Sequence, residues 1–119
     1  GTQRLARLIG KSRAIELMAE GTLLNAEQAR QEGLVNRLLE GEDFHAAVHA
    51  YARRFCNPDK SSRAVGSIKR AVSSGMDLPL ESGLALEREL QQQLFSGPDA
   101  AEGIAAFNGG RPPRFGSRS

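Results

Sequence analysis

The chain has 119 residues, enough for one domain with a modest core. Its 16 basic and 14 acidic residues give a net charge of +2 and are interleaved, which argues against a nucleic-acid-binding surface made from a block of like charge. Hydrophobic residues make up 39%, aromatic residues 5%, and Trp is absent, which favours helices packed through aliphatic side chains over a strand-rich sandwich.

Three short helices are predicted before residue 34. The first ends at Gly10, because glycine accepts the backbone conformation that commonly ends a helix. The second begins with Ser12 as its N-terminal cap and ends at Gly21. Asn25 and Gln28 have the spacing of a capping box at the start of the third. The apolar residues with helical spacing in the first two helices are Leu5, Leu8, Ile9, Ile15, Met18 and Ala19.

The segment LVNRLLE, residues 34–40, lies between two glycines and predicts at most one short strand, at about residues 34–39. The sequence predicts no second strand to pair with it. Because unpaired backbone groups are costly to bury, such a strand would need a sheet supplied by another part of the molecule.

Four more helices are predicted after residue 42. The first, residues 43–56, has the clearest i, i+3, i+4, i+7 pattern of apolar residues in the chain. The turn NPDKSS separates it from a second amphipathic helix that ends near Gly75. Pro79 is expected in the first turn of a long helix whose leucines spread over a broad face, which suggests contacts on more than one side. A last short helix carries Phe107 before a tail rich in Gly, Pro and Arg.

The residues alone predict neither a metal site nor a catalytic site. His45 and His49 have the i, i+4 spacing of two metal ligands, but there is no HExxH motif, and Cys56 lies about 10 Å further along the helix. We interpret the two histidines as surface or interface residues. Cys56 is expected to pack in the apolar stripe rather than to act as a reactive thiolate. Walker A and GxGxxG motifs are absent, and the carboxylates lie among other charged residues, as on a solvated helix face.

The expected cellular compartment is inferred from features that the sequence does not contain. A single cysteine excludes an internal disulfide and fits a reducing environment. No apolar run approaches the roughly 20 residues that span a bilayer, and no signal segment opens the chain. We therefore expect a cytoplasmic protein with no membrane partner and no nucleic-acid partner. The least favoured alternative is a small nucleic-acid binder acting through Arg111, Arg114 and Arg118 of the tail.

Four motifs follow one another in the order of a known family: GTQRL at the start, KSRA at the next helix, AEQARQEGLVN, and DAAEGIAAF near the end. Over nearly its whole length the chain resembles the second half of a crotonase, a member of the enoyl-CoA hydratase/isomerase superfamily. The resemblance implies a mainly α structure, the C-terminal helical region of a crotonase (ClpP/crotonase-like) fold. It also implies that residues 1–41 end the core region, 42–108 form a helical oligomerisation region and 109–119 form a tail.

The resemblance implies a C-terminal fragment that is catalytically incomplete by itself. In the family the oxyanion hole and the catalytic glutamates lie in the preceding part of the enzyme, so no catalytic residue is assigned here. The parent enzyme would hydrate or isomerise an acyl-CoA thioester through an enolate stabilised by the oxyanion hole. Coenzyme A enters as part of this substrate, and neither a separate cofactor nor a metal is expected. The helices would supply a subunit interface in a homo-oligomer, a trimer or a hexamer in this family.

The resemblance assigns three residues to CoA or acyl binding. Phe107 corresponds to a family phenylalanine near the CoA or acyl chain, often contributed by a neighbouring subunit. Many members continue F-x-E-K-R-x-P-x-F, with basic residues near the CoA phosphates, whereas this chain reads FNGGRPPRF. Gly109 and Gly110 replace the Glu-Lys pair, so Arg111 and Arg114 are the expected substitutes, since guanidinium groups suit phosphate. The alternative for this segment is a mobile, solubilising tail.

Helices that a whole crotonase would cover should expose apolar faces, so we expect self-association, with exchange of helices as one route. The alternative to an enzyme part is a non-catalytic helical oligomerisation or interaction module derived from a crotonase.

Overall fold

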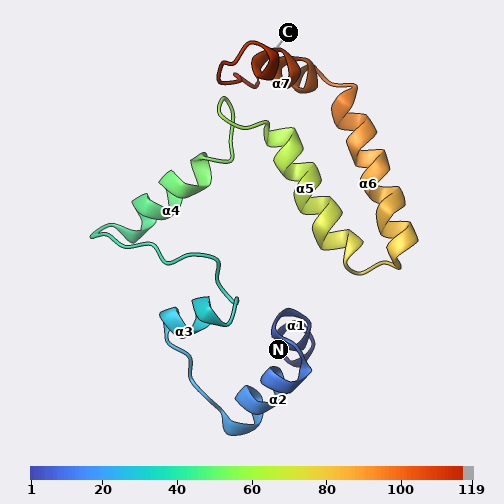
Figure 1. Cartoon of the computed structure of the whole chain (residues 1–119). Coiled ribbons are helices and arrows are strands. Elements are labelled where there is room, and N and C mark those ends of the chain that lie inside the picture. The colour runs from blue at the N-terminus through green and yellow to red at the C-terminus, as the bar shows by residue number, and fades with distance from the viewer. Residues whose placement is uncertain (117–119) are drawn as a thin grey trace. The chain divides into compact units, whose positions relative to one another are not determined.

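The computed structural model describes residues 1–116, in which every regular element is an α-helix (Figure 1). The helices are α1 (Thr2–Ile9), α2 (Lys11–Glu20), α3 (Ala26–Gln31), α4 (Phe44–Arg53), α5 (Ser62–Gly75), α6 (Leu80–Phe95) and α7 (Pro98–Asn108). The prediction of a mainly α structure is confirmed. Residues 34–39 are irregular backbone, because the described part of the chain contains no strand with which they could pair.

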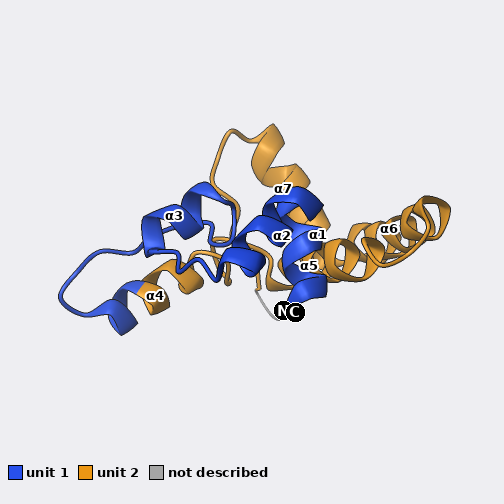
Figure 2. Ribbon diagram, turned by 90° about the horizontal axis from the view of Figure 1, so that it is seen from below, with its two compact units in different colours: residues 1–47 blue, residues 48–119 orange. Residues whose placement is uncertain are grey.

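The chain forms two compact units, residues 1–47 and the residues from Val48 on (Figure 2). The boundary falls inside α4, so each unit is described separately. The division at residues 41 and 108 that the resemblance implies remains a prediction.

In the first unit α1 packs against α2. The buried residues of α2 are Ala14 and Leu17, three positions apart on one face. Ile15 and Met18, which have helical spacing, lie on the surface of this unit, because Ile15 is 65% exposed and Met18 is 38% exposed. The second apolar face of α2 is therefore left uncovered within the described residues.

Capping explains where the first helices begin and end. Gly10 adopts φ 86° and serves both as the C-cap of α1 and as the N-cap of α2. The predicted Ser12 cap is therefore wrong, because α2 has already begun at Lys11. The capping box at Asn25 and Gln28 is confirmed, with both hydrogen bonds at 2.9 Å.

In the second unit α5 and α6 run side by side as an antiparallel pair, and α7 packs against α6 (Figure 1). The backbones of α5 and α6 come close at Gly75 and Gly83, where a β-carbon on Gly83 would lie 3.4 Å from the Gly75 carbonyl oxygen. The buried apolar residues of this unit are Leu90 on α6 and Ala106 on α7. The core of the second unit is thus small and lies toward α7.

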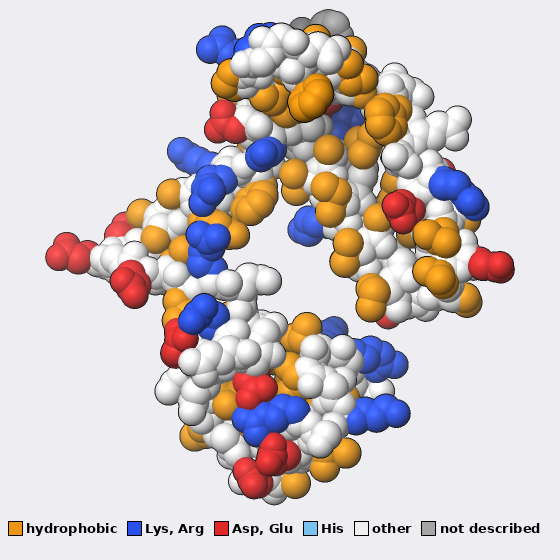
Figure 3. All heavy atoms as spheres, in the orientation of Figure 1, with side chains coloured by type: hydrophobic (Ala, Val, Ile, Leu, Met, Phe, Trp, Pro, Cys, Tyr) orange, Lys and Arg blue, Asp and Glu red, His pale blue; other side chains and the backbone are white. Residues whose placement is uncertain are grey.

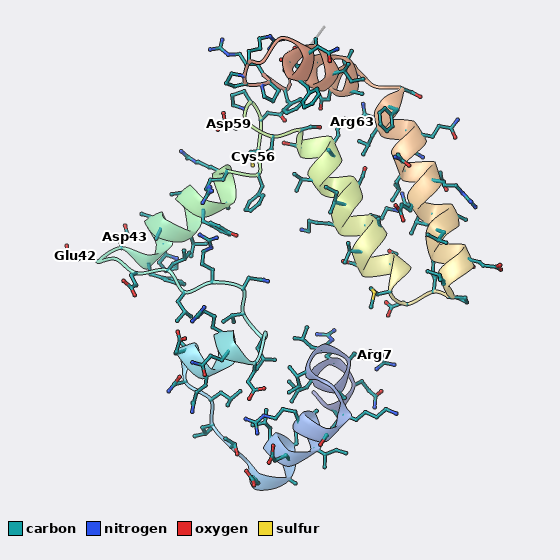
Figure 4. The ribbon with its side chains drawn as sticks, viewed as in Figure 1. Arg7, Glu42, Asp43, Cys56, Asp59 and Arg63 are labelled. Atoms are coloured by element: carbon teal, nitrogen blue, oxygen red, sulfur yellow. The ribbon has the colours of Figure 1, made fainter. Side chains whose placement is uncertain are left out.

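The helix at residues 43–56 is shorter than predicted. It ends at Arg53, so Cys56 lies in the loop that leads to α5 (Figure 4). The side chain of Cys56 is exposed, which contradicts the expected packing in an apolar stripe. The stripe stops with the helix, and Phe55 beyond it is 43% exposed. Its ring makes an edge contact with Tyr51, with centroids 5.2 Å apart.

No helix in residues 1–116 is long and apolar enough to cross a membrane.

Candidate functional site

The candidate site is the C-terminal end of the second unit, formed by α7 and residues 109–116. Pro98 begins α7 and Asp99 lies in its first turn, an arrangement that suits a helix N-terminus. Phe107 lies in the last turn and is 86% exposed. Glu102 and Phe107 are five positions apart, which places them roughly 140° apart around the helix. The aromatic ring and the acidic group of α7 therefore point to different sides.

The Glu102 side chain binds the segment that follows α7. The guanidinium of Arg111 donates from Nη1 to Oε1 of Glu102 at 2.7 Å and from Nη2 to Oε2 at 2.9 Å. The backbone N–H of Arg114 donates to Oε1 at 2.8 Å. This carboxylate thus accepts three hydrogen bonds from residues nine and twelve positions away. We call Glu102 with Arg111 and the Arg114 amide the Glu102 clamp.

The clamp shifts the pKa values of its two charged members. The Arg111 hydrogen bonds, followed by the Arg114 backbone donor, lower the pKa of Glu102 from 4.5 to about 2. The same contact raises the pKa of Arg111. Glu102 therefore stays ionised well below pH 4.5, and at neutral pH its charge and that of Arg111 cancel.

The two predicted arginines have different surroundings. The Arg111 guanidinium is occupied by Glu102 and also donates to the Pro112 carbonyl at 3.2 Å. The Arg114 side chain makes no hydrogen bond or ion pair within residues 1–116, because its link to the clamp is its backbone N–H. Arg118, the third arginine of the tail, lies outside the described residues.

A second anchor follows immediately. The Phe115 N–H donates to the Pro58 carbonyl at 2.9 Å, which ties the segment to the loop before α5. Gly116 has φ 81°, and a β-carbon there would clash with the side chain of Asn57. The segment up to Gly116 is therefore held by its own contacts, which differs from a mobile tail.

The Phe115 ring lies beside Gly103 at an apolar hollow of about 280 Å³ between the end of α6 and the starts of α5 and α7. Ser61 is buried at its edge and caps α5, accepting from the Ala64 N–H at 3.2 Å. The same hydroxyl donates to Oδ2 of Asp99. One serine therefore joins the N-terminal ends of α5 and α7.

A second surface lies between α5 and α6. An open apolar groove of about 470 Å³ is lined by both helices, and apolar side chains follow each of them (Figure 3). The large side chains on its walls are strongly exposed, with Ile68 at 61%, Met76 at 81% and Leu80 at 77%. The exposed apolar faces expected from the sequence are present here.

The histidines and the cysteine do not form a site. Within residues 1–116 no group of three or more His, Cys, Asp or Glu side chains is placed to hold a metal ion. His45 makes an edge contact with the Phe44 ring, with centroids 5.9 Å apart. The Cys56 thiol lies 3.8 Å from the Ala52 carbonyl oxygen.

Sequence reasoning missed the residues that organise this end of the molecule. Glu102 was present in the motif DAAEGIAAF, but its partners are nine and twelve positions away, outside any helical spacing. Ser61 had a detectable signal, since it follows the turn NPDK directly before an apolar stripe. Its second partner, Asp99, has no signal in local sequence.

Comparisons with known proteins agree with one another. A family model described as enoyl-CoA hydratase/isomerase matches residues 1–118. A probable enoyl-CoA hydratase of Mycobacterium bovis is 36% identical over 118 residues, covering 99% of this chain and 45% of that protein. A mitochondrial methylglutaconyl-CoA hydratase of Mus musculus is 36% identical over 119 residues, 97% of this chain and 37% of that protein. A solved enoyl-CoA hydratase of Geobacillus kaustophilus superposes with a TM-score of 0.87 at 39% identity, over 99% of this chain and 44% of that one. The chain spans less than half the length of these relatives.

Proposed function

Because the chain belongs to the enoyl-CoA hydratase/isomerase family, we propose that it is the C-terminal part of an enzyme acting on acyl-CoA thioesters. The observation that carries this proposal is the match along 99% of the chain to less than half of a solved enoyl-CoA hydratase. The order of the motifs from GTQRL to DAAEGIAAF supports the C-terminal position. The reaction is hydration or isomerisation through an enolate.

In this proposal the chain supplies no catalytic group. The oxyanion hole and the acid/base carboxylates belong to the remainder of the parent enzyme, and this part supplies a subunit interface and a wall of the CoA pocket. The α5–α6 groove supports an interface role, because exposed apolar surface of this kind usually contacts a partner. The assembly we propose is a homo-oligomer, a trimer or a hexamer.

The CoA-binding residues we propose are Phe107, Arg111 and Arg114. Phe107 offers an exposed aromatic ring to the acyl or pantetheine part of the ligand. The two guanidinium groups suit the CoA phosphates, although the Glu102 carboxylate offsets the charge of Arg111.

A hydration assay with crotonyl-CoA tests catalytic incompleteness. We expect no turnover above background from the chain alone. We expect turnover when it is co-expressed with the complementary N-terminal part of an enoyl-CoA hydratase relative. Clear turnover by the isolated chain would contradict the proposal.

The second candidate is a non-catalytic oligomerisation module derived from a crotonase. The exposed groove between α5 and α6 favours it, because that surface needs a partner but no substrate. Light scattering together with calorimetric titration of coenzyme A separates the two. Self-association without CoA binding favours the module, and CoA binding favours the enzyme part.

A further inference from the structure

Glu102 lies on α7 and binds the segment in which the proposed arginine contacts with CoA lie. Its carboxylate holds the Arg111 guanidinium and the Arg114 backbone N–H at the same time. We infer that Glu102 is a positioning residue, that it commits Arg111 to a structural ion pair, and that Arg114 is the arginine presented to a CoA phosphate. This inference rests on the proposed function and assigns different roles to the two arginines that it groups together.

Charge separates the two arginines. A phosphate that approached the Arg111 guanidinium would also approach the Glu102 carboxylate, which is bonded to it at 2.7 and 2.9 Å. The repulsion between the two anions offsets the attraction of the cation. The Arg114 side chain has no acidic partner within residues 1–116, so its positive charge is available to a ligand.

Placement separates them as well. The backbone of Arg114 is fixed on both sides, because its own N–H is bonded to Glu102 and the next N–H is bonded to the Pro58 carbonyl. With the backbone held, a ligand has to order only the side-chain torsions of Arg114. Such preorganisation lowers the entropic cost of binding. Removing Glu102 releases the first of these anchors.

The variant Glu102→Gln distinguishes positioning from simple charge. It removes one negative charge and frees the Arg111 guanidinium, so an effect of charge alone predicts tighter binding of coenzyme A. Positioning predicts weaker binding, because the neutral amide oxygen of Gln accepts the Arg114 N–H less strongly than the carboxylate does and cannot hold the Arg111 guanidinium through two oxygens. The two accounts therefore predict opposite signs.

The experiment titrates coenzyme A, with phosphate-free pantetheine as the comparison ligand, into the wild-type chain and its variants. We expect Arg114→Gln to weaken coenzyme A binding about fivefold and Glu102→Gln about threefold, with pantetheine unchanged. The matched controls Arg88→Gln and Glu81→Gln make the same charge changes on α6 and should leave both affinities unchanged. Tighter coenzyme A binding by Glu102→Gln, or unchanged binding by Arg114→Gln, overturns the inference.

Amide hydrogen exchange supplies a readout that does not depend on the ligand. In Glu102→Gln the amides of residues 114 and 115 should exchange faster, whereas Arg114→Gln should keep their protection because the backbone donor remains. Far-UV circular dichroism checks that each variant is folded. If the wild-type chain binds no coenzyme A, the CoA function and the role of Arg114 are overturned. Loss of amide protection in Glu102→Gln would still support positioning by Glu102 in that case. Unchanged protection in Glu102→Gln overturns the positioning role.

Discussion

The two ends of the α5–α6 pair differ in whether their side chains have partners inside the chain. Near α7, polar groups find partners inside the chain, as Ser61 does with Asp99 and Glu102 does with Arg111. Along the groove, apolar side chains such as Met76 and Leu80 remain more than three-quarters exposed. The difference shows that polar side chains can find hydrogen-bond partners within this unit, whereas these apolar faces need a covering surface that the described residues do not provide.

This contrast separates stability from assembly. The end near α7 contains the buried residues Leu90, Ala106 and Ser61, so substitutions there should act on the folding of this chain. The groove should contribute little to the folding of one chain and more to contact with a partner.

Truncation of Leu90 should have the largest effect. Leu90 is 4% exposed, so Leu90→Ala removes buried methyl groups and leaves a cavity, and we expect a loss of about 2–4 kcal/mol in the free energy of unfolding. Leu80 lies on the same helix and is 77% exposed, so Leu80→Ala should cost less than about 1 kcal/mol. Urea unfolding followed by far-UV circular dichroism measures both.

If Leu90→Ala proves too unstable to fold, the volume-conserving Leu90→Met should cost less than about 1.5 kcal/mol and still allow the comparison. Equal losses at Leu80 and Leu90 would contradict the distinction between the two ends. A Leu80 effect that grows with protein concentration would show instead that the groove is covered by a second copy of the chain.

The helices were predictable because their signals are local. Gly10, the Asn25 capping box and the apolar periodicity of residues 44–52 each act within one or two turns. The face that each helix buries was less predictable. Ile15 and Leu17 are similarly apolar, yet Ile15 is 65% exposed and Leu17 only 6%, a difference that depends on tertiary packing and not on the local pattern.

The candidate site was predictable in part, for a related reason. Family motifs drew attention to Phe107, Arg111 and Arg114, but no pattern along the chain predicts that a carboxylate on α7 binds the first arginine. The Glu102 clamp depends on how the chain turns after α7, at Gly109 and Gly110, where Gly110 adopts φ 60°. A turn of this kind brings together residues whose spacing in the sequence is not that of neighbours on one helix.

Loss of the Ser61 hydroxyl should have an intermediate effect. Ser61→Ala removes the cap of α5 and leaves the half-buried carboxylate of Asp99 without this donor, so we expect a loss of about 1–2 kcal/mol in unfolding free energy. Ser73→Ala makes the same chemical change at an exposed position of α5 and should be nearly neutral. An effect of Ser61→Ala no larger than that of Ser73→Ala would mean that Ser61 does not join the two helices.

The smallest effect is the pH dependence of the Glu102 clamp, because solvent reaches both groups, with the Arg111 side chain 48% and the Glu102 side chain 26% exposed. The pKa of Glu102 is lowered in the folded chain from 4.5 to about 2, so its stabilising contribution is fully present above pH 4.5 and is lost as the pH falls toward 2. The difference in unfolding free energy between wild type and Glu102→Gln should therefore shrink between pH 5 and pH 2.5, and protection of the Arg114 amide should fall with it. Glu81→Gln provides the matched control, since it removes a carboxylate that has no such partners within residues 1–116. A difference in unfolding free energy that stays constant, or grows, as the pH falls would show that the contact with Arg111 does not lower the pKa of the Glu102 carboxylate. In that case the ion pair would not stabilise the folded chain, and the polar end near α7 would no longer contrast with the groove as a region that is stabilised by contacts inside the chain.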